Sequence, residues 1–346
     1  MITLFKNARI LTMKDDKILC GDLVVKDNKI DFIGENYQGE SPDRIIECGG
    51  NLLMPGFKDA HAHTAMVFAR SAADDLPLDE WLHTTIFPME VKFQDDDIYH
   101  LTKLGILEYL TSGITAAFDM YFRVPEIVQA SEEMGFKSVI LATSDAEPIE
   151  LLKERFNTLN KEGNLCSYIL GIHSEYTCAE ERIKEVIKLA KELKSKIYLH
   201  IGETEKEVEG CIERHGMTPV KFLDSLGFFD NGGGGFHCNY FTDEEVEIFK
   251  KHNCSIVTCP CSNLKLASGI APLTRYQKAG LNIAIGTDGA ASNNALDMFR
   301  EMYLVSTLQK VTNKDPAVMD GFEVLKMATV NGSHALGLND CDVLEV

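Results

Sequence analysis

Two histidines separated by a single residue, His61 and His63, lie in the stretch MPGFKDAHAH. Side chains two positions apart in an extended chain point to the same side, so both imidazoles can reach one ion. Neutral imidazole is a good ligand for Zn²⁺, Fe²⁺ or Ni²⁺. Taken alone the pair is a weak signal, because two unrelated polar residues in a loop can have the same spacing.

Other residues capable of metal binding or proton transfer each follow a short apolar run, and these are Asp119, His173, His200, Glu203, His237 and Asp288. When parallel strands form a barrel, functional side chains collect beyond the carboxyl ends of the strands. Because His200 and Asp288 follow their strands as the histidine pair does, the sequence predicts a metal site at one rim. Asp119 also has a simpler interpretation, as a hydrogen-bond acceptor at the barrel mouth.

The segments that must position these residues alternate between strand-like and amphipathic helical patterns from residue 52 onward. Apolar runs that predict strands lie at 52–57, 114–119, 137–142, 167–172, 196–200, 234–238, 254–259 and 282–287. Stretches such as 97–113 and 180–194 place apolar residues three and four apart, as an amphipathic helix does. This pattern predicts a (β/α)8 TIM-type barrel over residues 53–346.

The first part of the chain has a different pattern. Its β-type runs ARILTM, DLVVKDNKIDFIGE and RIIECGG are broken by Asp-Asn, Gly-Glu and Gly-Gly turn signals. No amphipathic helix separates these runs, so they do not form an αβ unit. We therefore expect residues 1–52 to form a small β-rich side domain.

Composition restricts the partners and the compartment. The 346 residues carry a formal net charge of −19, which repels phosphate backbones and anionic membranes, so we expect neither nucleic acid nor membrane as a partner. No apolar run approaches the roughly 18 residues of a spanning helix, and the N-terminal stretch lacks the pattern of a secretory signal. The ten cysteines are scattered, which favours reduced thiols in a cytoplasmic protein. Whether the chain forms a homo-oligomer is left open.

Four motifs, PGFKDAHAH, HIGET, GFHCN and GTDGAASNN, resemble those of the amidohydrolase superfamily, and the resemblance covers nearly the whole chain. WLHTTIFPME and SNLKLASGIAP resemble, more narrowly, the group of 5-methylthioadenosine/S-adenosylhomocysteine deaminases. The resemblance implies one divalent metal ion per chain, with Zn²⁺ favoured over Fe²⁺ and Ni²⁺, and the ligands His61, His63, His200 and Asp288. It also implies strands after the final helix that complete the small sheet. This chain ends at DCDVLEV, so we expect the small domain to lack its C-terminal strands.

The same resemblance makes Glu203 the proton shuttle, places His237 beside the water at the metal, and gives Glu90 and His173 to the nucleoside. These residue types suit the chemistry. A bound metal can lower the pKa of water from about 15.7 to about 7. Asp288 can accept the proton released on attack, His237 can hydrogen-bond the attacking oxygen, and Glu203 can protonate the ring and then the leaving ammonia. Alternatively, Glu203 begins an acidic helix N-terminus.

The excursion from Ala65 to about Lys92 is too long for a plain strand-to-helix connection and could cap the site. Within it, Trp81 could stack on a flat base, although a single tryptophan is as often part of a core. Glu90 could accept hydrogen bonds from both hydroxyls of a ribose cis-diol, or could pair with a surface lysine. Beyond the 5′ carbon we expect an apolar pocket, and Arg123 is the candidate for binding a terminal carboxylate.

Three functions are compatible with these residues. The first is hydrolytic deamination of a 5′-substituted adenosine, giving the inosine analogue and ammonia. The alternative enzymes are a deaminase of a free purine base such as guanine and a triazine amino- or chlorohydrolase, since they use the same metal constellation. A catalytically inactive binding scaffold is disfavoured by the complete set of metal-binding and proton-transfer residues.

Overall fold

The computed structural model describes residues 1–72, 74–141 and 147–346 of the chain. These residues form two compact units, one of Met1–Gly56 with Gly337–Val346 and the other of Phe57–Leu336. The C-terminal segment therefore groups with the small sheet, whereas the sequence interpretation assigned all of 53–346 to the barrel. Within the described residues, no helix combines the length and hydropathy needed to cross a membrane.

The smaller unit is a β-sheet. Its strands are β1 (Ile2–Leu11), β2 (Ile18–Lys26), β3 (Lys29–Gly34), β4 (Arg44–Glu47) and β5 (Leu52–Leu53). They hydrogen-bond in the order β3-β2-β1-β4, and β5 pairs with β1. Buried side chains of β1 and β2, including Ile10 and Leu23, form its core. Leu344 packs on this cluster and its backbone N–H donates to the carbonyl of Thr12 (3.0 Å), which explains why the C-terminal segment belongs here.

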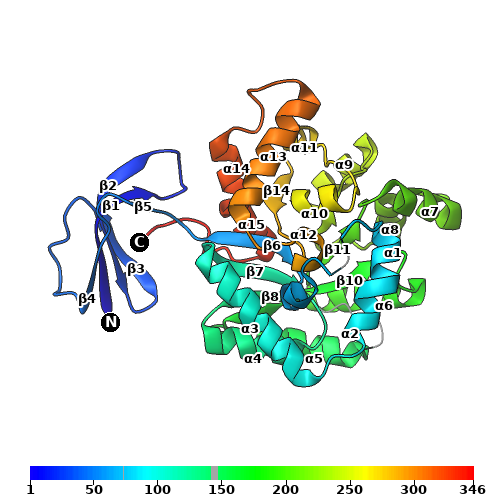
Figure 1. Ribbon diagram of the computed structural model, residues 1–346, viewed down its shortest axis with the longest axis horizontal. Helices are drawn as coiled ribbons and strands as arrows, with labels where there is room; N and C mark the ends of the chain where they lie inside the picture. The colour runs from blue at the N-terminus through cyan, green and yellow to red at the C-terminus, as the bar shows by residue number, and fades with distance from the viewer. Residues whose placement is uncertain (73, 142–146) are drawn as a thin grey trace. The chain divides into compact units, whose positions relative to one another are not determined.

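The larger unit is a (β/α)8 barrel, as the sequence predicts (Figure 1). Its strands are β6 (Phe57–Ala62), β7 (Ile114–Met120), β8 (Lys137–Leu141), β9 (Cys166–Tyr168), β10 (Leu170–Ser174), β11 (Ile197–Ile201), β12 (Gly233–His237), β13 (Cys254–Thr258) and β14 (Asn282–Ile285). All their pairings are parallel, in the orders β6-β7-β8-β9 and β10-β11-β12-β13-β14. β9 and β10 are two halves of the predicted fourth strand, separated at Ile169.

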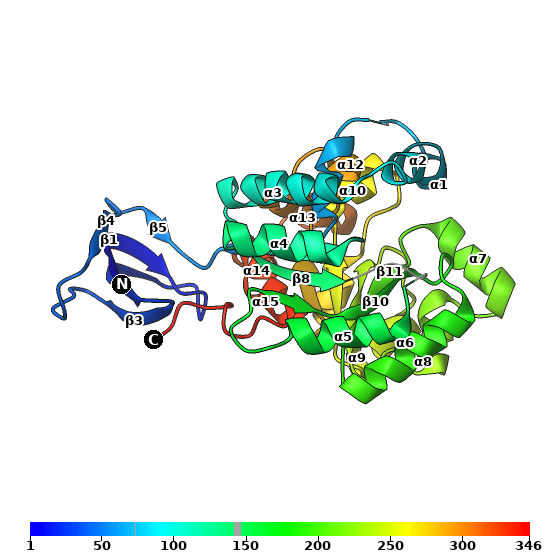
Figure 2. The ribbon, with the colours of Figure 1, turned by 90° about the horizontal axis from the view of Figure 1, so that it is seen from below.

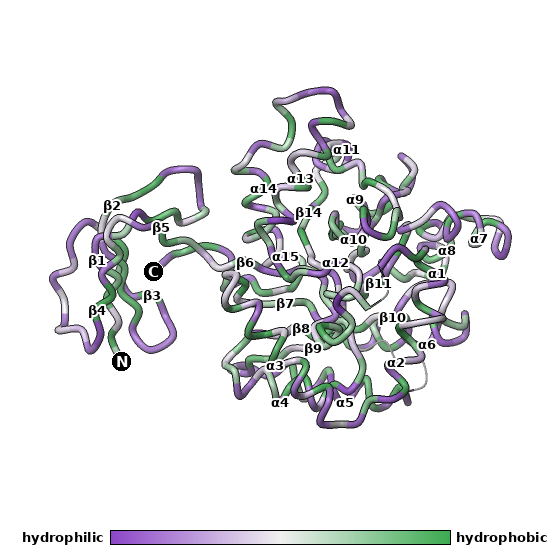
Figure 3. The backbone as a smooth tube through the Cα atoms, viewed as in Figure 1, coloured by the Kyte–Doolittle hydropathy of each residue, from purple (hydrophilic) through white to green (hydrophobic). Residues whose placement is uncertain are grey.

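Helices follow the strands and form an outer layer around the sheet (Figure 2). They are α3 (Asp95–Thr111), α4 (Val124–Met134), α5 (Ile149–Leu159), α6 (Glu180–Leu193), α7 (Glu205–His215), α8 (Pro219–Leu226), α9 (Asp243–Lys251), α10 (Pro260–Lys265), α11 (Leu273–Ala279), α12 (Ala290–Asn293), α13 (Met298–Asn313), α14 (Gly321–Ala328) and α15 (Val330–Leu336). In α6, Ile183, Val186, Ile187 and Ala190 are buried at spacings of three and four, while its charged residues face outward. Figure 3 shows hydrophilic segments concentrated on such peripheral elements, including α7.

The first barrel strand differs from its prediction. The sequence predicts a strand over 52–57, but Leu52 and Leu53 form β5 of the small sheet, and the barrel strand is Phe57–Ala62. The apolar run was misleading because the true strand, FKDAHA, carries site residues and is polar despite being fully buried. His61 therefore lies inside the strand and His63 follows it directly. The third strand is observed over Lys137–Leu141, and Ala142 lies outside the described residues.

A buried carboxyl group joins two of the segments that follow barrel strands. Glu301 of α13 is fully buried. It accepts hydrogen bonds from the backbone N–H of Cys261 in α10 (3.0 Å) and from Nδ2 of Asn293 in α12 (2.8 Å). Burial raises the pKa of Glu301 to about 8. The group therefore favours its protonated form in the folded protein at neutral pH.

This shift predicts a pH dependence of stability. Between the ordinary pKa of 4.5 and the folded-state value of about 8, Glu301 binds more protons in the folded than in the unfolded chain. Its contribution to the free energy of unfolding therefore falls as pH rises, by up to about 1.4 kcal/mol per pH unit. We expect the Tm of the wild type to decline more steeply than that of Glu301→Gln through this window. Parallel Tm profiles in thermal melts would contradict the assignment.

Candidate active site

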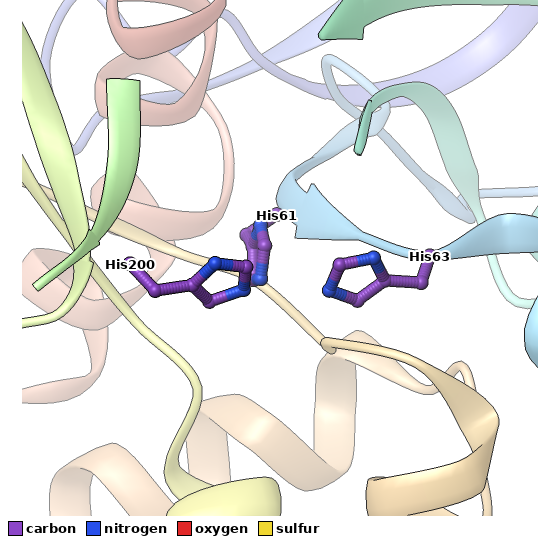
Figure 4. Close-up of side chains that lie close together, drawn as sticks. All are labelled: His61, His63 and His200. Atoms are coloured by element: carbon purple, nitrogen blue, oxygen red, sulfur yellow. The ribbon is translucent and has the colours of Figure 1, made fainter. Parts of the chain in front are cut away.

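Three histidines meet at the carboxyl ends of the barrel strands. His61 of β6, His63 directly after it and His200 of β11 point toward one another in Figure 4. One ring nitrogen from each lies within 4.8 Å of the others, and a second group of the same kind contains His61, His237 and Asp288. Because His61 belongs to both groups, the five residues surround a common centre.

Hydrogen bonds fix the orientation of two of these rings. Nδ1 of His63 contacts the carbonyl of Met120 (2.5 Å), and Nδ1 of His200 contacts the carbonyl of His173 (2.8 Å). A carbonyl oxygen only accepts, so both Nδ1 atoms carry hydrogen and both Nε2 atoms keep a lone pair for another partner. This is the arrangement of a metal-binding histidine whose second nitrogen is held by a carbonyl.

His61 supplies the strongest indication that an ion belongs here. Its side chain is completely buried, and neither ring nitrogen has a hydrogen-bond partner among the described residues. A buried polar nitrogen without a partner is costly unless it has another ligand. Burial, reinforced by neighbouring imidazoles, holds the pKa of His61 and of His200 well below the ordinary value of 6.5. Neutral imidazole is the form that binds a cation, so the donor set fits a divalent metal ion.

Asp288 adds a carboxylate to the imidazoles. Its Oδ1 lies 3.3 Å from Nε2 of His63 and 3.7 Å from Nε2 of His61. Its Oδ2 accepts the hydroxyl of Ser262 (2.6 Å). Burial alone would raise the pKa of Asp288, but His63 and His237 outweigh it and lower the pKa below the ordinary 3.8. The group is therefore an anion that can ligate a cation and accept a proton.

Glu203 and His237 face each other across the same centre. Glu203 follows β11 and its Oε2 lies 3.8 Å from Nε2 of His237, while its Oε1 accepts the hydroxyl of Ser268 (2.9 Å). Burial raises the pKa of Glu203. Burial opposes a charge on His237 as well, but the charges of Glu203 and Asp288 prevail and raise the pKa of His237. The pair can therefore hold or exchange a proton inside a buried pocket.

The backbone that carries Glu203 is held by the first turn of the helix that follows it. The carboxylate of Glu207, in the first turn of α7, accepts the backbone N–H groups of Gly202 and Glu203 (both 2.7 Å). Burial raises the pKa of Glu207 to about 7. The acidic stretch after His200 thus does begin a helix, as one interpretation of the sequence held. Glu203 lies before that helix, with its side chain in the pocket.

A cavity of about 110 Å³ lies over this centre. It is lined by His63, Met66, Leu78, Trp81, Leu82, Phe87, Glu90, Met120, Tyr121, Phe122, His173, Tyr176, His200, Glu203, His237, Leu266, Asp288 and Ser292. The excursion between β6 and α3 contributes one wall through α1 (Leu78–Trp81), the π-helical turn η2 (Leu82–Ile86) and α2 (Phe87–Glu90). Its start is the short helix η1 (Thr64–Ala69). The wall is apolar except for Glu90.

Glu90 meets a hydroxyl from the opposite wall. Its Oε1 accepts the hydroxyl of Tyr121 (2.6 Å), and burial raises the pKa of Glu90. Trp81 is buried and lines the same cavity. His173 also lines it, with burial lowering its pKa to about 4, and its Nδ1 lies 3.1 Å from the hydroxyl of Thr177.

Arg123 is the candidate that the structure places elsewhere. It is not among the residues that line the cavity, and its Nη2 donates to the carbonyl of Phe93 (3.5 Å). It is the residue that precedes α4, and its φ is left-handed at 60°. Asp119 accepts the backbone N–H of Thr64 (2.9 Å), which agrees with its simpler interpretation as an acceptor at the barrel mouth.

Several site residues were missed from the sequence. Tyr121 and Phe122 line the cavity directly after β7, and their place beside Asp119 at a strand end was a usable signal. Ser262 and Ser268 bond the carboxylates of Asp288 and Glu203. Serine is too common in loops for its type to reveal such a role, so these two gave no signal.

Known proteins are similar to this chain in sequence and in fold. A model of the amidohydrolase family matches residues 52–346. A 5-methylthioadenosine/S-adenosylhomocysteine deaminase of Thermoanaerobacter pseudethanolicus is 40% identical over 347 residues, which cover 97% of this chain and 80% of that protein. A 5′-deoxyadenosine deaminase of Methanothermobacter thermautotrophicus is 39% identical over 328 residues, which cover 92% of this chain and 77% of that protein.

A solved structure agrees with the sequence relatives. The chain is similar to a crystal structure of an adenosine deaminase from Xanthomonas campestris with bound zinc, with a TM-score of 0.92 and 30% identity. The similarity covers 99% of this chain and 82% of that one. Because the family model and the relatives extend over most of its length, the chain belongs to the amidohydrolase family.

Proposed function

We propose that this chain is a metal-dependent deaminase of 5′-substituted adenosines, which replaces the 6-amino group with oxygen from water and releases ammonia. The observation that carries the proposal is a half-buried carboxylate, Glu90, in the same cavity as the histidine cluster. The names of the relatives support it, since they describe deaminases of 5-methylthioadenosine, S-adenosylhomocysteine and 5′-deoxyadenosine.

His61, His63, His200 and Asp288 would hold one divalent ion, with Zn²⁺ favoured because a solved relative contains zinc. When bound, the ion would supply Lewis-acid activation of the attacking water. The imidazoles would bind the ion as neutral donors and Asp288 as an anion, so the ligands would contribute one negative charge against the two positive charges of the ion. Such a site would keep a net positive charge, which lowers the pKa of a nearby water and so favours its deprotonated form as the nucleophile.

Proton transfers fall to three side chains. Asp288 accepts the proton that water releases as its oxygen bonds to the purine carbon. Glu203, kept protonated more readily by burial, donates its proton to the adjacent ring nitrogen, then receives the proton held by Asp288 and passes it to the leaving amine. Nε2 of His237, 3.8 Å from Glu203, hydrogen-bonds the attacking oxygen. The purine carbon gains its bond to oxygen and loses its bond to nitrogen, ammonia leaves, and the second proton of the water restores Glu203 as the carbonyl forms.

The ribose would be recognised by Glu90. A carboxylate can accept one hydrogen bond from each hydroxyl of a cis-diol, and these bonds would replace the solvent that burial removes. Tyr121 already donates to one oxygen and so holds the carboxylate in place. A free base or a triazine has no diol and would leave the half-buried Glu90 without such partners. The proposal therefore favours nucleosides over free bases.

The 5′ substituent would occupy the apolar wall formed by Leu78, Leu82, Phe87 and Phe122. Among the described residues that line the cavity there is no lysine or arginine. The residues outside the described ranges contain none either. A 5′ group that ends in a carboxylate would thus lose water without gaining a cation, so we infer a preference for uncharged substituents.

The first prediction separates metal binding from turnover. Glu203→Gln should keep one equivalent of zinc and lose roughly 10²–10⁴-fold in kcat, because it removes proton transfer and leaves the ligands intact. His200→Ala, the matched variant three residues earlier in β11, should lose both zinc and activity. Elemental analysis and initial rates measure the two properties. Near-normal kcat in Glu203→Gln would remove the shuttle role.

The second prediction concerns the ribose. For 5-methylthioadenosine, Glu90→Ala should lower kcat/KM by roughly 10- to 100-fold, as expected for the loss of hydrogen bonds to a charged group. The wild type should also prefer this nucleoside to adenine and guanine. Steady-state rates on the three compounds provide the test. A free base as the better substrate would refute the nucleoside assignment and leave the metal hydrolase intact.

The third prediction concerns the 5′ group. The wild-type kcat/KM for 5-methylthioadenosine should exceed that for S-adenosylhomocysteine by at least roughly 10-fold, because burying an unpaired carboxylate costs more than about 1.4 kcal/mol. Arg123→Ala should alter both substrates equally. If Arg123→Ala selectively impaired S-adenosylhomocysteine, Arg123 would be its carboxylate ligand after all.

A further inference from the structure

A chain of three hydrogen bonds runs beneath the candidate centre and connects the segments after β11, β12 and β13. Nδ2 of Asn239 donates to the carbonyl of Glu203 (2.9 Å). Nδ2 of Asn263 contacts Oδ1 of Asn239 (3.0 Å), and Oδ1 of Asn263 contacts Nδ1 of His237 (2.8 Å). All four residues are buried. None of these bonds involves a residue assigned above as a metal ligand.

The direction of every bond in this chain follows from its first member. The carbonyl of Glu203 can only accept, so Asn239 must present its NH₂ group there and its Oδ1 to Asn263. Asn263 must then present its own NH₂ group to Asn239, since two amide oxygens 3.0 Å apart would repel. Its Oδ1 therefore faces His237 and accepts from Nδ1–H. Reversing either amide would set two acceptors against each other.

We propose that Asn239 and Asn263 are positioning residues that fix His237 in the tautomer with hydrogen on Nδ1, so that Nε2 is its working atom. The inference deepens the proposed function and rests on it. With Nδ1 donating to Asn263, Nε2 is the ring nitrogen left for partners at the candidate centre. That atom faces Glu203 at 3.8 Å. A ring nitrogen of His237 also lies within 4.8 Å of ligand atoms of His61 and Asp288.

The backbone at this point gives independent support for a positioning role. His237 and Cys238 both have left-handed φ values, 72° and 52°, which residues other than glycine rarely adopt. Such a conformation persists only where its surroundings impose it. The hydroxyl of Tyr276 donates to the carbonyl of Cys238 (2.6 Å), and the N–H of Asn239 donates to the carbonyl of Gly202 (2.8 Å). These bonds hold the turn in the conformation that places His237 at the cavity and Asn239 within hydrogen-bond distance of Glu203.

Removal of the acceptor should change the tautomer. In Asn263→Leu, Nδ1 would face an apolar side chain, and the ring hydrogen would move to Nε2, where it can donate to Glu203. Asn263→Asp keeps an acceptor opposite Nδ1 and should keep the hydrogen there. A matched control is Asn282→Leu, because Asn282 at the start of β14 is partly buried and also bonds two other segments, through Ser255 and Asn331.

The experiment measures two-bond ¹H–¹⁵N correlations of the histidine rings in the full-length, zinc-free protein, with the His237 signals assigned through His237→Gln. We expect Nδ1–H in the wild type, Asn263→Asp and Asn282→Leu, and Nε2–H in Asn263→Leu. Zinc stoichiometry should be unchanged in all four proteins. A wild-type His237 with hydrogen on Nε2, or an Asn263→Leu spectrum identical to the wild type, would overturn the proposal.

Activity supplies the second readout. With 5-methylthioadenosine as substrate, Asn263→Leu should lower kcat roughly 10- to 100-fold, the range for partners that orient active-site groups, with little change in KM. Asn282→Leu should retain its kcat. Equal losses in Asn263→Leu and Asn282→Leu would indicate a merely structural role and refute the positioning assignment. If the wild type deaminated no nucleoside, the proposed function would fail, whereas the tautomer spectrum would still decide this proposal.

Discussion

The site depends on the closure of the barrel between its last strand, β14, and its first, β6. The backbone N–H of Asp288 donates to the carbonyl of His61 (2.9 Å). Asp59 of β6 accepts both the N–H and the hydroxyl of Thr287 (2.8 and 2.5 Å). Gly286 permits this approach, since a Cβ there would lie 2.7 Å from the backbone of His61. Without this seam, the carboxylate of Asp288 would not face the imidazoles.

Closure brings many polar groups into a dry interior, where each needs a partner. Four buried carboxyl groups accept hydrogen bonds from backbone or side-chain donors of the segments that follow the strands, and these are Asp59, Asp119, Glu207 and Glu301. Burial raises the pKa of each of them. His61 is different, because its ring nitrogens have no partner among the described residues. The supporting carboxyls therefore hold these segments to one another, and both ring nitrogens of His61 are left for an ion.

The sequence predicted the barrel and the residues of its rim well, because imidazoles and carboxylates at successive strand ends are rare by chance. It misplaced the first strand, since the polar FKDAHA lacks the apolar signal that Leu52 and Leu53 supplied falsely. It nominated Arg123 by residue type, but whether a side chain reaches a pocket depends on the local backbone. The hydrogen bonds of Ser262, Ser268 and Asn239 could not be predicted, because they join segments that only the finished fold brings together.

Two separate parts of the chain line the cavity. The rim residues after β11, β12, β13 and β14 are tied to one another by buried hydrogen bonds, so a change in one disturbs the others. The opposite wall comes from one continuous segment, Leu78–Glu90. The side chains that it places against the cavity are apolar except for Glu90. The bond between Tyr121 and Glu90 links this segment to the barrel inside the cavity. A substitution in this segment therefore leaves the buried hydrogen bonds of the rim in place.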